Sequence, residues 1–376
     1  MELPEKMGWF RILVLVAALI TAADACERSS TGARRLTAAD DPVERDAAAK
    51  AFCEEHDLTE RRTPVRVYDL FMFNDELDML EIRLMTLYDV VDFFVIVESK
   101  MTHQGRPKAL HYADNRRRFA NFEDKIAHVV LDDLQGQSSY YKEWYHREML
   151  FEKGLSVRGR EARPGDLIIS GDLDEIPRPA AVQALRSCEW ALRPGYHDCA
   201  VLEGAFFYYS FSWYAGEWSP GPKVFRHDVR ETMEAMDKND MRYNSNCTLF
   251  MKQASWHCTD CFSSIRAVKN KISAFCHAEK DRYPYNETEW IVDRVIRGLA
   301  LFEPKEDKAR LQKVPYCDTA PPAVLANPAK YHYMLARHPV TGSFSDYAEW
   351  LGNRTDVVGN FHAQWLDPVT EQIESV

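Results

Sequence analysis

The amino-acid sequence predicts an α/β fold in which helices flank a mostly parallel central sheet. Four apolar runs of strand length lie at residues 67–73, 93–97, 126–131 and 166–170. They lack the alternation of polar and apolar residues that marks a half-exposed strand, so we expect each to be buried on both faces. Segments with helical spacing lie between them, and such alternation of strands and helices is typical of parallel sheets.

The helices between these strands follow from capping signals and apolar spacing. After the first strand, Asn74 and Asp75 are predicted to cap a helix whose leucines recur at positions 77, 80, 84 and 87. A second helix is predicted over residues 140–154. Ligands of such sheets bind at the carboxyl ends of the strands, and this sequence places acidic residues at those ends.

The composition limits the classes of protein that fit the chain. Of its 376 residues, 46% are hydrophobic and 28% are charged, which excludes a wholly disordered or fibrous protein. The formal net charge of −11 argues against general nucleic-acid binding, because that requires a dense basic surface. An acidic protein that binds an anionic substrate needs a local cation at its binding site.

The N-terminus predicts entry into the secretory pathway. An apolar run at residues 12–23 follows Lys6 and Arg11 and precedes Ala-Asp-Ala at 23–25. As a helix this run would be ~18 Å long, shorter than a ~30 Å bilayer core. Residues 1–25 are therefore predicted to be a signal peptide, with a short signal-anchor as the alternative. A lumenal location agrees with three N-x-T sequons, at Asn246, Asn286 and Asn353.

The rest of the chain divides by composition into three parts. Residues 26–63 are rich in charged residues, alanine and threonine, and we predict a stem or linker. Residues 64–335 contain the predicted strands and helices and form the main domain. Residues 336–376 are predicted to be a C-terminal extension.

Nine cysteines suit an oxidising compartment. Four of them are close in sequence and lie near two histidines: Cys247, Cys258, Cys261 and Cys276, with His257 and His277. The grouping is compatible with zinc, but in a lumenal protein we favour disulfides. Since nine is odd, at least one thiol stays free or pairs with another chain.

The sharpest chemical motif is the acidic turn, defined as residues 171–174 (Gly-Asp-Leu-Asp). It follows a buried strand, and Pro177 prevents further sheet. Alternate side chains of an extended segment point the same way, so Asp172 and Asp174 are expected to converge. Adjacent carboxylates repel unless a cation lies between them, and their oxygens favour Mg²⁺ or Mn²⁺ shared with substrate phosphates.

Two enzyme classes place such a pair of aspartates after a buried strand. In haloacid-dehalogenase-like phosphatases the first aspartate is the nucleophile, whereas in nucleotide-sugar glycosyltransferases the pair holds a metal ion on a diphosphate. The phosphatase motif normally lies on the first strand. Here the motif lies on about the fourth strand and continues as Glu-Ile-Pro, which favours the transferase.

Longer stretches resemble glycosyltransferase family 17, in order and spacing, over about residues 65–335. They include VYDLFMFNDELDMLEIRL (67–84), VDFFVIVESKMTHQGRPKAL (91–110), GDLIISGDLDEIPRP (165–179), EWSPGPKVFR (217–226) and SWHCTDCFSSI (255–265). The resemblance implies a GT-A-like fold and inverting, Mn²⁺- or Mg²⁺-dependent transfer of N-acetylglucosamine from UDP-GlcNAc. The implied acceptor is the β-linked core mannose of glycoprotein N-glycans. The implied location is the Golgi lumen, as a single-pass type II membrane protein, or outside the cell after signal cleavage.

The resemblance also assigns expected roles to residues. Asp172 and Asp174 bind the metal and the diphosphate, and His257 or His277 completes the metal site. The expected nucleotide-binding residues are Asp75, Glu98, Lys108, Arg147, Asp172 and Lys223. For Glu98 the alternative is a capping role in the turn, and for Arg147 it is a surface ion pair.

An inverting transfer also needs a carboxylate base that deprotonates the acceptor hydroxyl. The candidates are Glu217, Asp260 and Glu279, and Glu217 is preferred because the adjacent Trp218 offers a stacking surface for an acceptor sugar. Two other functions stay open at this point. One is a catalytically silent carbohydrate-binding protein that keeps the fold, and the other is the phosphatase.

Overall fold

The computed structural model describes residues 50–51, 53–54, 58–63, 65–227 and 246–352. The apolar run at 12–23, most of the predicted stem and the sequon at Asn353 lie outside the described residues. Within those ranges, no helix has the length and apolar character needed to cross a membrane.

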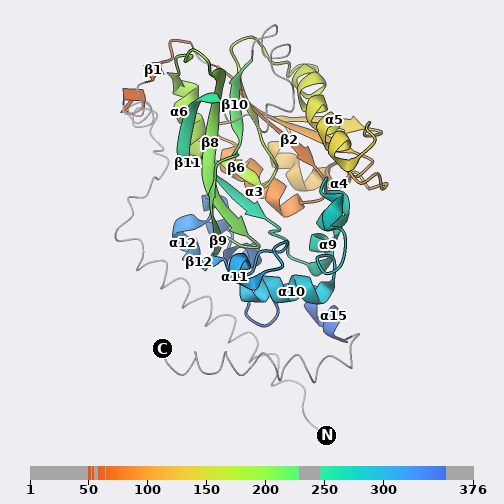
Figure 1. Cartoon of the computed structure of the whole chain (residues 1–376). Helices are drawn as coiled ribbons and strands as arrows, with labels where there is room; N and C mark the ends of the chain where they lie inside the picture. The colour runs from red at the N-terminus through yellow and green to blue at the C-terminus, as the bar shows by residue number, and fades with distance from the viewer. Residues whose placement is uncertain (1–49, 52, 55–57, 64, 228–245, 353–376) are drawn as a thin grey trace.

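The four predicted strands form the parallel half of the central sheet. They are β2 (Val67–Phe73), β3 (Phe93–Ser99), β4 (Ile126–Leu131) and β5 (Leu167–Ser170), in the spatial order β5-β2-β3-β4. Each contact between neighbours in this half is parallel. The α/β class and the parallel pairing predicted from the sequence are therefore confirmed (Figure 1).

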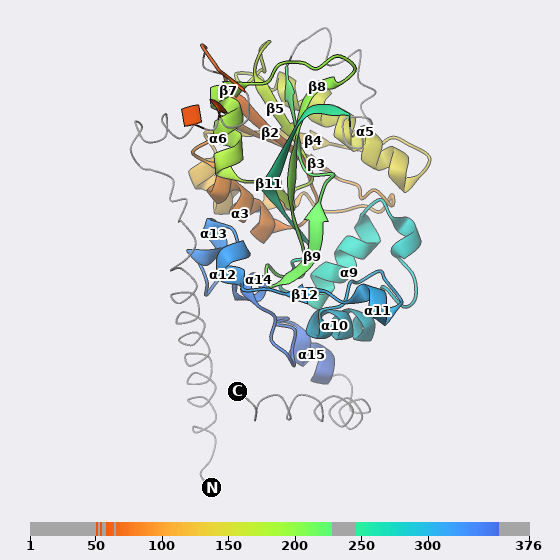
Figure 2. The ribbon, with the colours of Figure 1, turned by 60° about the vertical axis from the view of Figure 1, so that its left-hand side comes forward.

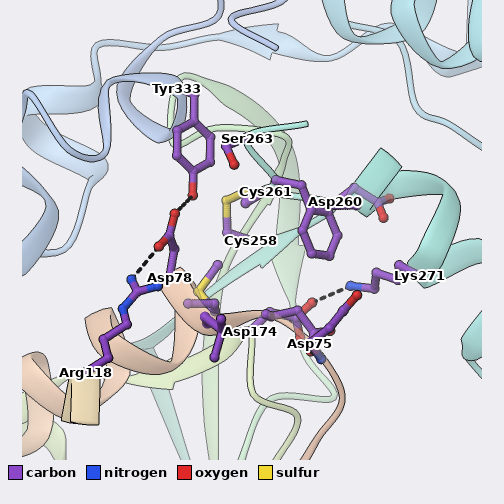
Figure 3. A pocket seen from close by; sticks show the side chains of 15 residues that line it. Asp75, Asp78, Arg118, Asp174, Cys258, Asp260, Cys261, Ser263, Lys271 and Tyr333 are labelled. Carbon is purple, nitrogen blue, oxygen red and sulfur yellow. Dashed lines mark hydrogen bonds and ion pairs between the residues drawn. A yellow bond between two sulfur atoms is a disulfide. The ribbon is translucent and has the colours of Figure 1, made fainter. Parts of the chain in front are cut away.

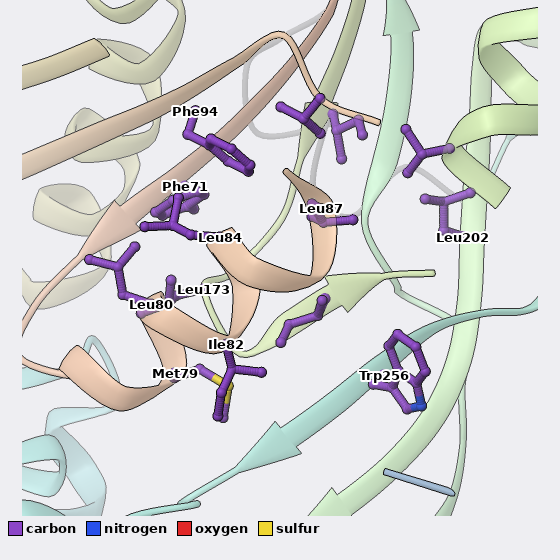
Figure 4. Close-up of a cluster of buried hydrophobic side chains, with 14 of the residues drawn as sticks. Phe71, Met79, Leu80, Ile82, Leu84, Leu87, Phe94, Leu173, Leu202 and Trp256 are labelled. Atoms are coloured by element: carbon purple, nitrogen blue, oxygen red, sulfur yellow. The ribbon is translucent and has the colours of Figure 1, made fainter. Parts of the chain in front are cut away.

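Helices cover both faces of this half, which explains why its strands are apolar throughout. On one face, side chains of β2 and β3 pack against Leu80 and Leu84 of α3 (Leu77–Leu87), as Figure 4 shows. On the other face, Leu150 of α5 (Ser139–Glu152) belongs to a second cluster with β2 and β3. Each fully buried side chain of this size stabilises the fold by about 1.5–3 kcal/mol.

The start of α3 differs from the prediction. Its N-cap position is Glu76, without a side-chain cap hydrogen bond, so Asn74 and Asp75 do not cap the helix. Instead, the Asp75 N–H donates to Glu76 Oε2 at 3.0 Å, and the Leu77 N–H donates to the Asp75 carbonyl at 2.9 Å. The second predicted helix is confirmed as α5, and its N-cap Ser138 accepts a hydrogen bond from the Tyr141 N–H.

Antiparallel strands extend the sheet beyond β5, which we did not predict. In spatial order they are β10 (Lys223–Arg226), β8 (His197–Tyr208), β9 (Trp213–Trp218) and β12 (Gln312–Lys313). The long strand β11 (Cys247–Thr259) runs beside and parallel to β8 (Figure 2). It also pairs antiparallel with the short β6 (Glu175–Pro177). This pairing sets His257 opposite Glu175, the residue that follows the acidic turn.

The other elements are short or lie at the edges. They are β1 (Thr59–Glu60), α4 (His111–Asp114), η1 (Arg116–Phe122), η2 (Gly154–Ser156), α6 (Pro179–Ser187), β7 (Cys188–Glu189), α9 (Ile265–Ala274), η3 (Ala278–Lys280), α10 (Thr288–Arg297), α11 (Glu306–Ala309), α12 (Tyr316–Thr319), α13 (Pro322–Leu325), α14 (His332–Leu335) and α15 (Tyr347–Gly352).

A third hydrophobic cluster joins α9 and α10 to the segment that follows residue 335. Ile272 of α9 and Ile291 of α10 belong to it together with Phe344. Asp346 also accepts hydrogen bonds from the N–H groups of the first turn of α9, at 2.8 and 3.0 Å. The described part of the predicted C-terminal extension therefore packs against the helix that begins after β11.

Disulfides account for most of the described cysteines. They join Cys53 to Cys188, Cys199 to Cys247 and Cys258 to Cys261, and Cys317 is disulfide-bonded as well. Cys276 is a buried free thiol. The preference for disulfides over zinc is thus confirmed for Cys247, Cys258 and Cys261. The first disulfide and the pairing of β1 with β7 also tie the end of the predicted stem to the main domain.

Candidate functional site

A buried arginine fixes the backbone of the acidic turn. Arg83 of α3 forms an ion pair with Asp69 of β2, and both side chains are fully buried. The same guanidinium donates to the carbonyls of Asp172 at 2.8 Å and Glu175 at 2.7 Å. The Asp172 N–H in turn donates to Glu175 Oε2 at 3.0 Å. The backbone is held by these bonds, so the two aspartate side chains can take other partners.

Asp174 pairs with a lysine from the distant helix α9. Its Oδ2 accepts a hydrogen bond from Lys271 Nζ at 2.9 Å, and its Oδ1 lies 3.7 Å from His257 Nε2. Burial alone would raise the pKa of Asp174, but the charges of Lys271 and His257 outweigh burial and lower it below the ordinary value. Asp174 is therefore an ionised carboxylate at neutral pH.

Asp172 pairs with an arginine from α5 instead. Arg147 Nη2 lies 2.6 Å from Asp172 Oδ1 and 2.6 Å from Glu143 Oε1. Burial disfavours the charged guanidinium, but the two carboxylates outweigh this effect and raise the pKa of Arg147 well above its ordinary value. Arg147 forms an ion pair, as in the alternative considered from the sequence, but this pair joins it to the acidic turn and Arg147 is buried instead of lying at the surface.

A pocket opens beside Asp174, between α3, the end of β11 and α9 (Figure 3). Its lining residues are Asp75, Glu76, Leu77, Asp78, Met79, Arg118, Asp174, Cys258, Asp260, Cys261, Phe262, Ser263, Ala267, Lys271 and Tyr333. Five of these are acidic and only Arg118 and Lys271 are basic. On one side Lys271 reaches Asp174, and on the other Tyr333 and Arg118 meet at Asp78 (Figure 3).

Asp260 lines this pocket, and one oxygen of its carboxylate is buried without a hydrogen-bond partner. It follows the last residue of β11 and is 2% exposed, and its buried Oδ2 has no hydrogen-bond partner. Burial raises the pKa of Asp260 to about 6, and the charge of Asp174 adds to that rise while Lys271 opposes it. A carboxylate of this kind changes protonation state near neutral pH, as a general base does.

The other two candidate bases lie elsewhere. Glu217 is exposed on β9 and accepts a hydrogen bond from the Tyr214 hydroxyl at 3.2 Å. Glu279 is exposed on η3, where it contacts His277 at 3.0 Å and the Tyr140 hydroxyl at 3.3 Å. Neither glutamate, nor His277, is among the residues that line the pocket with Asp174. His257, the other predicted metal ligand, lies beside Asp174.

The predicted nucleotide-binding residues come from several elements. Asp75, Glu98 and Asp172 lie at the ends of parallel strands, whereas Lys108 follows β3, Arg147 lies in α5 and Lys223 lies on β10. Asp75 lines the pocket, and burial raises its pKa while the charge of Lys108 opposes that rise. Lys108 Nζ donates to the Asn74 carbonyl at 3.1 Å and lies 3.8 Å from Glu98 Oε1. Lys223 is buried on β10, in register with the last residue of β5.

Glu98 has the capping role that we considered as the alternative. It is fully buried, and its two oxygens accept hydrogen bonds from the N–H groups of Tyr112 at 2.9 Å and Ala113 at 3.3 Å. These belong to the first turn of α4, where a carboxylate is stabilised by the helix dipole. His128 Nε2 lies 3.3 Å from the same carboxylate.

The carboxylates that line the pocket beside Asp174 are of the chemical type that binds a divalent cation. The described residues contain no ready-made group of three or more His, Cys, Asp or Glu side chains arranged to hold a metal. Carboxylates outnumber basic groups in the pocket, and burial raises the pKa values of Asp75 and Glu76, so negative charge there is only partly compensated. A cation bound to Asp174 Oδ2 would take the place that Lys271 Nζ now holds.

Several pocket residues were missed from the sequence. Lys271, Glu76, Asp78, Arg118 and Tyr333 all line the pocket, and none was predicted. Glu76 adjoins the predicted Asp75 and Asp78 lies three residues after it, so both could have been found from the same stretch of sequence. Lys271 and Tyr333 come from distant segments that reach the pocket only through tertiary folding.

Comparison with known proteins identifies the family of this chain. The model of glycosyltransferase family 17 matches residues 39–337. The human protein named β-1,4-mannosyl-glycoprotein 4-β-N-acetylglucosaminyltransferase is 26% identical over 310 residues, which cover 74% of this chain and 56% of that protein. The rat and mouse proteins of the same name are each 33% identical over 156 residues, covering 40% of this chain and 29% of theirs.

The chain thus spans about half the length, or less, of the curated relatives it matches. The family match covers most of this chain. It includes the acidic turn, both of its basic partners and the whole pocket. The chain therefore belongs to glycosyltransferase family 17.

Proposed function

We propose that this protein is an inverting, metal-dependent glycosyltransferase that moves N-acetylglucosamine from UDP-GlcNAc to a glycan. The proposed acceptor is the β-linked core mannose of glycoprotein N-glycans, and the proposed linkage is β-1,4. The observation that carries the proposal is the family match over residues 39–337, which includes Asp174 and its pocket. The names of the human, rat and mouse relatives support the donor sugar and the acceptor.

The acidic turn supports a transferase better than the phosphatase considered from the sequence. A phosphatase of that type uses the first aspartate as its nucleophile, and here that residue, Asp172, forms an ion pair with Arg147 at 2.6 Å. Membership of a glycosyltransferase family points the same way. A catalytically silent protein that keeps the fold is separated from the enzyme by the activity test below.

In the proposed reaction Asp260 is the general base. It takes the proton of the acceptor hydroxyl as that oxygen bonds to the anomeric carbon, while the bond from that carbon to the diphosphate breaks and UDP leaves. Its pKa of about 6 leaves it mostly ionised at pH 7 and still able to accept a proton. Asp260 replaces Glu217 as the preferred base because it shares the pocket with Asp174.

The leaving diphosphate meets positive charge from both sides of the acidic turn. Lys271 is held at Asp174 and Arg147 at Asp172, so two cations are already oriented before substrate binds. A divalent cation held by Asp174, with His257 as a further candidate ligand and Asp172 reaching it through water, would add positive charge on the diphosphate. Positive charge beside the diphosphate stabilises the negative charge that develops as UDP leaves.

The proposed location is the lumen of the secretory pathway, in the Golgi. Its support is the disulfide content of the described residues, which suits an oxidising compartment. The N-terminal segment would be the membrane anchor if it is not cleaved.

The test is a screen of UDP-sugars against defined N-glycans, with Mn²⁺ and with chelator. We expect transfer from UDP-GlcNAc to the core mannose with Mn²⁺, loss of transfer with EDTA, and a β-linked product from the α-linked donor. No transfer and no hydrolysis of any UDP-sugar would instead support the silent carbohydrate-binding protein. Transfer that persists in EDTA would contradict the metal dependence alone.

A further inference from the structure

A small disulfide ring closes the turn that carries Asp260. Strand β11 ends at Thr259, and the chain turns through Asp260 before α9 begins at Ile265. Cys258 and Cys261 are joined across this turn, and both are nearly fully buried. The disulfide and Asp260 line the same pocket (Figure 3). The turn therefore connects the sheet to the helix that supplies Lys271.

The Asp260 backbone adopts a conformation that a non-glycine residue rarely takes. Its φ is 55°, in the left-handed region, which favours glycine and which aspartate adopts only occasionally. Two backbone hydrogen bonds flank it, from the Phe262 N–H to the Asp260 carbonyl at 2.9 Å and from the Tyr209 N–H to the Thr259 carbonyl at 2.9 Å. The strained residue is thus embedded in a turn that is held on both sides.

The side chain of Asp260 is held less firmly than its backbone. Its Oδ2 is buried and has no hydrogen-bond partner. At that oxygen no neighbour fixes the carboxylate, so its direction depends on the backbone conformation of the turn. The ring closed by Cys258 and Cys261 is the covalent restraint on that conformation.

We propose that the Cys258–Cys261 disulfide is a positioning device for Asp260, keeping its carboxylate in the pocket where the acceptor hydroxyl is deprotonated. This inference rests on the proposed function, in which Asp260 is the base. It assigns to the disulfide a role in catalysis that is separate from global stability.

The chain contains a matched control on the same strand. The Cys199–Cys247 disulfide joins β8 to the first residue of β11, whereas Cys258 lies near the last. Its cysteines are 48 residues apart in sequence, against 3 for the pocket disulfide. In the chain-entropy model the longer loop stabilises the fold more. Removal of the control disulfide should therefore lower stability more, whereas removal of the pocket disulfide should lower activity more.

Charged and titratable groups face Asp260 from several elements, and they set its protonation. They are Lys271 of α9, Asp174 of the acidic turn, Glu76 before α3, Arg337 after α14, and Tyr208 and Tyr209 at the end of β8. Burial raises the pKa of Asp260. If the turn opens and the carboxylate reaches water, its pKa should fall toward the ordinary aspartate value.

The experiment compares Cys258→Ala/Cys261→Ala with Cys199→Ala/Cys247→Ala in the full chain. For the pocket pair we expect kcat to fall about 10²-fold, as for a displaced catalytic group, with the KM for UDP-GlcNAc within about twofold. The acid limb of its pH–rate profile should move to lower pH. The control pair should lower Tm more, keep kcat within about threefold and leave the acid limb in place.

Each outcome decides the matter. A pocket variant that folds and binds UDP like wild type but keeps the wild-type kcat and acid limb would overturn the positioning role. If the alanine pair does not fold, the corresponding serine pair is measured, and failure of both to fold would assign the disulfide to stability. Asp260→Asn distinguishes a failure of the proposed function from a failure of the disulfide proposal. An active Asp260→Asn variant would refute the role of Asp260 as the base, whereas an inactive one leaves the disulfide test valid.

Discussion

The two carboxylates of the acidic turn are one residue apart, yet they face different regions of the molecule. Asp172 faces the parallel half, where Arg147 of α5 holds it, and its side chain is 32% exposed. Asp174 faces the region of β11 and α9, where Lys271 and His257 lie beside it, and its side chain is 15% exposed. A short motif thus provides two carboxylates, and the tertiary fold gives each of them a different basic partner.

The largest effect should come from Asp174. We expect Asp174→Asn to lower kcat about 10³-fold or more, because Asp174 is the deeper carboxylate and lines the reaction pocket. Asp172→Asn should cost less, since Asp172 acts partly through Arg147. Steady-state kinetics with Mn²⁺ measure both, and near-ultraviolet circular dichroism checks that each variant folds. Equal losses for the two variants would remove the distinction between the two environments.

Asp260→Asn should lower kcat about 10²- to 10³-fold and abolish the acid limb near pH 6, because it removes the proposed base. It should also make the protein more stable at pH 7. In the folded wild type the pKa is raised to about 6, so the protein loses stability as pH rises from the ordinary aspartate range through 6. Thermal melting at pH 5 and pH 7 checks this, and an unchanged Tm at pH 7 would contradict the raised pKa.

Lys271→Met should lower kcat/KM about ten- to a hundredfold. It removes a cation beside the leaving diphosphate, and it also removes the charge that opposes the raised pKa of Asp260. The acid limb of the pH–rate profile should therefore move to higher pH, opposite to the shift expected without the pocket disulfide. In Arg147→Met, which lies on the Asp172 side, the acid limb should stay where it is.

The smallest effects should come from the two exposed glutamates. Glu217→Gln and Glu279→Gln should each keep kcat within about threefold of wild type, because neither lines the pocket that contains Asp174. Kinetics with saturating donor and acceptor measure this. A loss of 10²-fold or more in Glu217→Gln would return the base to β9 and remove Asp260 from that role.

The parallel half was the predictable part of the molecule. Strands buried on both faces are uniformly apolar, so β2 to β5 and the carboxylates at their ends could be located from the sequence. The acidic turn was found for the same reason. The predicted cap of α3 was wrong, because Glu76 takes the N-cap position instead of Asn74 or Asp75.

The region around α9 was much less predictable. Lys271 lies 97 residues after its partner Asp174, within a helix whose other exposed positions are also polar or basic. Local pattern therefore does not separate it from a surface lysine. Tyr333 meets Asp78 across 255 residues. The three candidate bases could not be ranked by environment from the sequence, since neither burial nor a shared pocket can be inferred from a lone glutamate or aspartate in a turn.

The most direct test of the account is a crystal structure of the protein with UDP and Mn²⁺. We expect Mn²⁺ at Asp174, the diphosphate beside the acidic turn, and Lys271 moved from Asp174 toward the phosphate oxygens. A nucleotide bound elsewhere, with the Lys271–Asp174 contact intact and no manganese density at this corner, would contradict the account.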